Sequence, residues 1–496
     1  MSLLIHLLIF CFATSTEVPT AARQALNALP EKKVTLSVVL NKSIESSDSF
    51  QILQTKKQAI PLAELYSSSS FDLQMQGSYG LSEDSREMAA SIMPSDIESE
   101  SYNLTFSKYL SSGTSLSLTL DHGSQAFNVA STDIPEYFET KTEFRFSQSL
   151  WRDAFGLASR NNYRAGQIES QATKKEYEKD VQVWAKDVGS LFYSTWLAQA
   201  QVKSARTVTA LRKRLLNISR KKLQRGTTEQ PDFLQIEASY MAALSTQEEA
   251  EEALQEAWQR LVVLVKLPLE WLDIDASIIP MSLDEPSKTA RLLCETQKQV
   301  ESYALKELEA KAKAARLKDL ASENLKKPDI QFTASIASNG IENDAAEAIS
   351  EAGDYEHDQW FVGLSFSYPL ENSKAKADAI QANIERKVWE ARYQEAKANL
   401  DADWISRCND LRLKVRNWDR AMEIAKKQRL RARLEEKRFS IGKSNVLQMV
   451  QAGNDLAQSE FNLNQAEIAL REAAWQVMDL SSQVRSYLQG IGVQIP

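Results

Sequence analysis

Hydrophobic and polar residues alternate along six short segments of this chain. The alternation is strict over about eight to ten residues in the longest segments, which is typical of β-strands that have one apolar and one polar face. A strand of this kind suits a barrel with lipid outside and water inside. We therefore expect four strands in the first half of the chain and two in the second, at about 71–79, 102–110, 114–121, 140–150, 329–338 and 359–369.

Outside these strands, apolar residues recur at spacings of three and four. Val181, Trp184, Val188 and Leu191 illustrate a pattern that predicts long coiled-coil-like helices. At about 1.5 Å per residue, a helix of about 70 residues would extend roughly 100 Å, which no compact domain needs. We expect two such helices, one over 151–225 and one after residue 370, with return helices at 231–267 and 445–486 and shorter helices at 32–65 and 288–326.

The second half of the chain repeats features of the first. Phe146 recurs as Phe366, an offset of 366 − 146 = 220, and Gly226 recurs as Gly442, an offset of 442 − 226 = 216. Similarity over such a period usually marks one structural unit used twice. We predict a first repeat at 32–267, a linker at 268–287, a second repeat at 288–486 and a C-terminal tail at 487–496.

Composition narrows the functional classes. The net charge is −8 and no basic stripe is interleaved with aromatic residues, which argues against a nucleic-acid partner. An apolar run at 3–13 has the length of a signal-peptide core, so residues 1–22 are predicted to be a signal peptide and leader. No other apolar run approaches 20 residues, so any membrane insertion would have to use strands.

Few residues in the chain are suited to catalysis or metal binding. The histidines are His6, in the leader, and His122 and His357, in expected loops, so a metal site or a histidine-based triad is not expected. Cys294 and Cys408 lie in helical segments without CxxC spacing, and the sequence favours two unpaired cysteines over a disulfide. We expect no enzymatic activity, no cofactor and no metal.

Two kinds of local sequence carry a family resemblance. The strand-to-helix joins are residues 146–151 and 366–370, and the helix-hairpin tips are residues 226–235 and 442–452. In their order, spacing and duplication, these segments resemble the TolC-type outer-membrane efflux family. The resemblance implies a mainly α fold with a transmembrane β-barrel portion, in which strands are shared in a homotrimer and long antiparallel helical hairpins form an α-barrel.

The resemblance also implies a function and a location. Members of the family are passive exit ducts for efflux or type I secretion, and they work with an inner-membrane pump and a periplasmic adaptor protein. The expected location is the outer membrane of a Gram-negative bacterium, with the helical part in the periplasm. Two other readings of the residues are a soluble periplasmic coiled-coil scaffold and an adaptor-like binding protein.

The hairpin tips supply the candidate site residues. The resemblance implies adaptor contact at Gly226, Gly442, Lys443 and Ser444. The family usually places an acid six residues after the tip glycine and a polar or acidic residue at nine, so the pore-constriction candidates are Asp232, Gln235, Gln448 and Gln451, the last two departing from the acidic pattern. The alternative for Asp232 is that it serves only as a helix N-cap. Gly226 and Gly442 are most simply left-handed helix C-caps, which is compatible with adaptor contact.

The number of strands is a departure from the family minimum of two per half. The hairpin at 102–121 gives four strands in the first half, so we predict six strands per protomer and eighteen per trimer. The alternative is that this hairpin folds outside the barrel. Segments 81–100, 122–139 and 340–358 are expected to be long loops, the last with seven acidic residues and no Lys or Arg.

Overall fold

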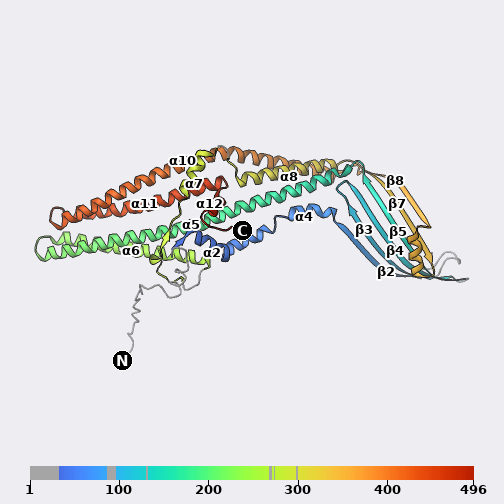
Figure 1. Ribbon diagram of the computed structural model, residues 1–496, viewed down its shortest axis with the longest axis horizontal. Coiled ribbons are helices and arrows are strands. Elements are labelled where there is room, and N and C mark those ends of the chain that lie inside the picture. Colours follow the sequence, from blue (N-terminus) through green and yellow to red (C-terminus); the bar gives the residue numbers. More distant parts are fainter. Residues whose placement is uncertain are drawn as a thin grey trace, which may run out of the picture. The chain divides into compact units, whose positions relative to one another are not determined.

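The computed structural model describes residues 33–85, 96–129, 132–266, 271–272, 274–297 and 300–495 (Figure 1). The expected leader at 1–22 lies outside these residues. The described chain divides into two compact units. The sheet unit comprises residues 58–176 and 304–396, and the hairpin unit comprises the other described residues. The predicted mainly helical fold with additional strands is confirmed.

One antiparallel sheet dominates the sheet unit, with its strands in the order β2-β3-β4-β5-β7-β8. Figure 1 shows the six strands side by side. The hairpin β3–β4 lies within the sheet, between β2 and β5, so all six predicted strands belong to one sheet. The strand bounds are Leu73–Asp84 (β2), Asp96–Tyr109 (β3), Thr114–Val129 (β4), Thr132–Ser149 (β5), Asp329–Glu342 (β7) and Asp358–Ser367 (β8).

The strands are longer than their apolar alternation indicates. Most described residues of the expected loops 81–100 and 122–139 are paired strand residues. Polar cross-strand contacts extend the pairing there, as where the Tyr137 hydroxyl donates to Gln125 Oε1 at 2.9 Å. The expected loop 340–358 contains helix α9 (Ala345–Asp354), because the Asp344 carboxylate accepts from the amide of Ala346 at 2.8 Å and caps the helix.

The register gives the sheet two chemically different faces. Phe106 pairs with Leu118, and Leu118 pairs with Phe144, so apolar side chains line up across neighbouring strands. On the other face, Asn103 donates to Asp121 and Thr105 donates to Thr119. The apolar face is exposed in the single chain; its exposed members include Leu73, Met75, Tyr79, Tyr102, Leu118, Leu120, Phe144, Ile336, Trp360, Val362, Leu364 and Phe366.

Side-chain hydrogen bonds and a close contact between two glycines fix the connection between β5 and the helix that follows. Asp153 has a φ of 56°, and its carboxylate accepts from the amides of Ala158 and Ser159 at 2.6 and 3.0 Å. Gly113, in the β3–β4 turn, approaches Gly156 so closely that a Cβ on Gly113 would lie 2.5 Å from the Gly156 nitrogen. Helix α5 therefore begins at Leu157, after the short helix η3 (Ala154–Gly156), and not at Trp151 as the sequence predicts.

Two pairs of long helices follow the sheet strands. The first hairpin is α5 (Leu157–Gln224) with α6 (Gln230–Val265), and the second hairpin is α10 (Ser373–Ser440) with α11 (Val446–Leu480). Both α5 and α10 have 68 residues. The shorter helices are α2 (Leu36–Ser46), α3 (Asp48–Lys57), α4 (Leu62–Ser68), η2 (Ser69–Phe71), η5 (Ala276–Ile278), α7 (Pro286–Thr296), α8 (Tyr303–Leu325) and α12 (Val484–Gly490).

The expected single helix at 32–65 is broken. It begins as strand β1 (Val34–Thr35), which pairs in parallel with β6 (Met281–Ser282). Ser47 then interrupts the helical backbone with a ψ of 140°, and its hydroxyl accepts from the Phe50 amide at 3.3 Å to start α3. Serine favours such local hydrogen bonds over continuing a helix, which explains the break.

The hairpin unit is held together far from its tips by a buried polar network and a disulfide. Asp284 accepts from the hydroxyls of Tyr193 and Tyr487, and Trp475 donates to the Tyr193 oxygen at 2.9 Å. Burial beside this carboxylate raises the pKa of both phenols, which keeps them protonated donors. The expectation of unpaired cysteines is wrong, because a disulfide joins Cys294 of α7 to Cys408 of α10.

Candidate functional site

Each hairpin turns at a left-handed glycine. Gly226 has a φ of 70°, and the next amide, of Thr227, donates to the carbonyl of Lys222 at 2.9 Å. Gly442 has a φ of 77°, and the amide that follows it donates five residues back at 2.8 Å. This is the hydrogen-bond pattern of a Schellman C-cap. A Cβ at either glycine would meet no atom within 4 Å, so backbone conformation and not space requires glycine.

An apolar cluster joins the two hairpins next to these turns. The first hairpin contributes residues from α5 and α6, and the second contributes residues from α10 and α11. Because buried apolar area is a large favourable term, the cluster holds the two tips against each other. Its buried members are Leu211, Leu215, Leu216, Ile236, Phe439, Val446 and Met449.

Arg212 adds a polar connection beside the apolar cluster. Its side chain is 1% exposed, and Nη2 donates to the carbonyl of Val450 at 2.9 Å and to Asn454 Oδ1 at 2.6 Å. The close approach of Gly453, where a Cβ would lie 3.2 Å from Nη2, leaves room for the guanidinium. Burial lowers the pKa of Arg212. The helical pattern of the sequence gives no sign that this arginine is buried.

The residues predicted for adaptor contact lie at the tip of the second hairpin. Lys443 is exposed, whereas Ser444 is half-buried and donates to Glu435 Oε2 at 2.7 Å. Arg438 contacts Glu435 at 3.0 Å and donates to the Lys443 carbonyl at 3.4 Å. The turn is therefore ordered by Glu435 and Arg438 of α10, which carry no distinguishing signal in the sequence.

The constriction candidates lie on the return helices and remain outside the apolar cluster. Asp232 and Gln235 are exposed in the first turns of α6, and Gln448 and Gln451 are exposed on α11. The reading of Asp232 as an N-cap is wrong, because the N-cap of α6 is Glu229. Asp232 instead lies in the first helical turn, where a carboxylate interacts favourably with the helix dipole.

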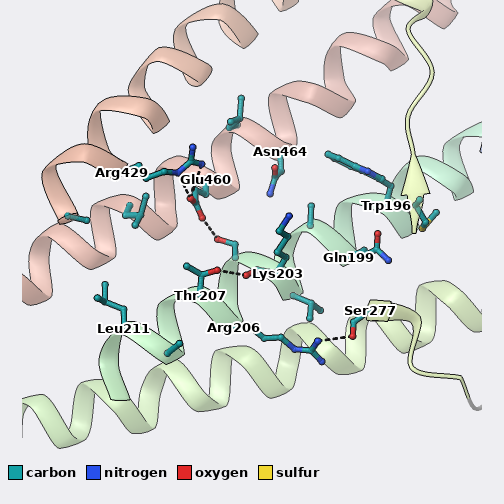
Figure 2. Close-up of a pocket in the computed structure, with 18 of the residues that line it drawn as sticks. Trp196, Gln199, Lys203, Arg206, Thr207, Leu211, Ser277, Arg429, Glu460 and Asn464 are labelled. Carbon is teal, nitrogen blue, oxygen red and sulfur yellow. Dashed lines mark hydrogen bonds and ion pairs between the residues drawn. The ribbon is translucent and has the colours of Figure 1, made fainter. Parts of the chain in front are cut away.

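A groove lies between the two hairpins, further along α5 from the tips (Figure 2). It has a volume of about 1380 Å³, and it is lined by α5, α10, α11 and the segment 277–281. Figure 2 shows Lys203 rising from α5 beside Asn464 of α11, with Leu211 and Trp196 near opposite ends. Gln199 donates to the carbonyls of Ala276 and Ile279 at 2.8 and 2.6 Å, which fixes the neighbouring segment.

Cations outnumber carboxylates in the groove. It contains two carboxylates, and both are paired: Glu460 with Arg429 at 3.0 Å and Glu436 with Arg214 at 3.5 Å. The net formal charge is 5 − 2 = +3, although the whole chain carries −8. The five cationic residues are Lys203, Arg206, Arg214, Arg429 and Arg433.

One family model matches part of this chain. Residues 114–265 match the family model described as outer membrane efflux protein. The predicted family resemblance is confirmed. The matched segment of the efflux-protein family runs from the start of β4 through the first hairpin. A search of curated protein sequences finds no match.

Solved structures share the fold over nearly the whole chain. The outer membrane protein VceC of Vibrio cholerae matches with a TM-score of 0.63 at 11% identity, over 90% of this chain and 96% of its own. The CmeC outer membrane channel of Campylobacter jejuni matches with a TM-score of 0.64 at 13% identity, over 92% and 88%. The MtrE outer membrane channel of Neisseria gonorrhoeae matches with a TM-score of 0.60 at 14% identity, over 90% and 88%.

These matches favour the efflux-channel reading over a soluble scaffold or an adaptor. None of the described helices is long and apolar enough to cross a membrane. Within the described ranges, no group of three or more His, Cys, Asp and Glu side chains is arranged to hold a metal ion.

Proposed function

We propose that this chain is the protomer of a trimeric outer-membrane efflux channel, a passive duct that performs no chemistry of its own. The observation that carries the proposal is the six-stranded sheet with one apolar face, one polar face and two open edges. The apolar face meets lipid, and the polar face lines water. Transport then depends on the width and charge of the duct.

The open edges supply the reason for assembly. β2 and β8 end the strand order, so their outer backbone groups have no strand partner in the described chain. Unpaired backbone groups are too costly in hydrocarbon for an open sheet to persist there. Pairing β8 of one protomer with β2 of the next removes both edges, and three copies of a six-stranded sheet close into eighteen strands.

The hairpin tips are the proposed meeting point with a periplasmic adaptor and, through it, an inner-membrane pump. Gly226, Gly442, Lys443 and Ser444 form the contact, because the two turns carry exposed backbone and an exposed cation. Asp232, Gln235, Gln448 and Gln451 line the narrowest part of the duct. Three copies of Asp232 would favour cations there, since a ring of carboxylates attracts positive charge.

Bilayer recording tests the duct directly. Purified full-length protein reconstituted in a planar lipid bilayer is expected to give discrete single-channel conductance. Asp232→Asn is expected to reduce the preference for cations, measured as the reversal potential in a salt gradient, while Glu229→Gln at the same tip serves as the matched control. Absence of any conductance from trimeric, folded protein would contradict the proposal.

Adaptor contact needs a separate experiment in cells. A photo-crosslinking amino acid at Lys443 is expected to capture a periplasmic protein that mass spectrometry identifies as an adaptor. The same amino acid at Lys426, an exposed cation further along α10, is the control. Equal capture at both positions, or capture at neither, would contradict the assignment of the tips.

A further inference from the structure

The groove of Figure 2 separates two regions in which the two hairpins pack against each other. On the tip side, the cluster that includes Leu211 and Met449 is packed and buried. On the other side, Trp475 of α11 donates to the hydroxyl of Tyr193 on α5 at 2.9 Å. Protein interiors are normally close-packed. A space of about 1380 Å³ between two packed regions is therefore a candidate binding site.

The α5 face that lines the groove is polar where a packed helix contact would be apolar. Gln199, Lys203 and Thr207 recur at every fourth residue, so they share one face of α5. None of these side chains is buried. Within the groove, α5 meets α11 through a polar contact, in which the Ser204 hydroxyl donates to Glu460 Oε2 at 2.9 Å.

Two of the five cations in the groove have no counter-charge. Arg429, Arg214 and Arg206 are each paired with a carboxylate. Lys203 of the first hairpin and Arg433 of the second have no ion-pair partner among the residues that the structure describes. The groove therefore holds unneutralised positive charge on both of its walls, inside a chain whose net charge is negative.

We propose that this groove is a binding site for an organic anion that carries an apolar body. The anionic group, a carboxylate or a sulfonate, binds between Lys203 and Arg433, where the lysine provides a point charge and the arginine a planar pair of donors. The apolar body lies along the half-buried Trp196 and the neighbouring Ile279 and Met281. The groove thus offers an apolar surface for the body of the ligand and cationic groups for its anionic end.

Binding at this position connects the two hairpins. An anion held by Lys203 on α5 and Arg433 on α10 adds a bridge between two helices that are already joined by the ion pair of Arg214 with Glu436. A ligand that binds the folded chain and not the unfolded chain raises its melting temperature with ligand concentration. Because both cations are exposed, added salt weakens the binding.

Calorimetric titration of the full-length protein in an uncharged detergent tests the site. The probe is 1-naphthalenesulfonate, and the uncharged comparison compound is 1-naphthalenemethanol. The double variant Lys203→Gln, Arg433→Gln is expected to bind the sulfonate at least 10-fold more weakly. The control double variant is Lys213→Gln, Lys426→Gln, which removes the same charge from exposed positions of α5 and α10 outside the groove and is expected to bind within 2-fold of the parent.

Three outcomes would overturn the proposal: no binding of the sulfonate, equally tight binding of the alcohol, or equal loss in the two double variants. Lys203 and Arg433 make no ion pair in the described chain, so the double variant should still fold. Its melting temperature without ligand should equal that of the parent protein. A melting-temperature rise with the sulfonate that disappears in the Lys203→Gln, Arg433→Gln variant gives a second readout. Neither measurement requires a pore, so failure here is separate from failure of the channel proposal.

Discussion

Removal of the Cys294–Cys408 disulfide is expected to destabilise the hairpin unit strongly. The two cysteines are 114 residues apart in the sequence, and the bond ties α7 to α10. In the chain-entropy model of cross-links, closing a loop of this length stabilises the folded chain by about 5 kcal/mol. With roughly 2 °C of melting temperature per kcal/mol in a large domain, the double variant Cys294→Ser, Cys408→Ser should melt about 10 °C lower.

The assay is thermal unfolding of the full-length protein in detergent, followed by circular dichroism with and without reductant. Reductant is expected to shift the parent toward the double variant and to leave the double variant unchanged, which separates the cross-link from other effects of reduction. Mass spectrometry of the unreduced digest should find the two cysteine peptides joined. If thiol labelling of the denatured, unreduced protein modifies Cys294 and Cys408, or if reductant leaves the parent unchanged, the reasoning is refuted.

Three further substitutions test other parts of the molecule. Leu215→Ala removes a fully buried member of the tip cluster and should cost about 2–5 kcal/mol, seen as faster limited proteolysis at the tips; unchanged cleavage would contradict the packing. Burial raises the pKa of Asp479, so the folded chain binds its proton more tightly than the unfolded chain, and stability falls as pH rises above the unfolded value of about 3.9; Asp479→Asn should raise the melting temperature more at pH 8 than at pH 3, and a shift independent of pH would count against this. Leu364→Arg on the exposed apolar face should cost roughly 2–4 kcal/mol and reduce the trimer recovered from outer membranes, whereas Ser365→Arg on the polar face should have little effect; equal yields would argue against a lipid-facing surface.

The sheet was the part of the fold most accessible from sequence. Alternation at 114–121 predicts β4 because Leu116, Leu118 and Leu120 place an apolar side chain at every second position, on one face of the strand. The strand ends were missed because polar residues continue the pairing there, as Gln125 and Tyr137 do, and polar pairs leave no periodic apolar signal.

Features made by contacts between distant segments could not be predicted. Cys294 and Cys408 carry no spacing signal, and only the packing of α7 against the second hairpin brings them together. Arg212 resembles any exposed helical arginine until α11 covers it with Val450 and Asn454. The groove is formed jointly by α5, α10, α11 and the segment 277–281, so no single stretch of sequence indicates it. The role of Asp284 likewise depends on Tyr193 and Tyr487, which are distant in the sequence and donate hydrogen bonds to it.

The central claim is that open edges β2 and β8 of neighbouring copies pair to close a membrane barrel. Single-particle electron cryomicroscopy of the purified protein in lipid nanodiscs tests this directly. The expected result is a threefold-symmetric particle with an unbroken ring of eighteen strands, the polar faces inward and each β8 hydrogen-bonded to the β2 of its neighbour. A monomeric particle, or one in which these two edges remain unpaired around no central bore, would contradict the claim.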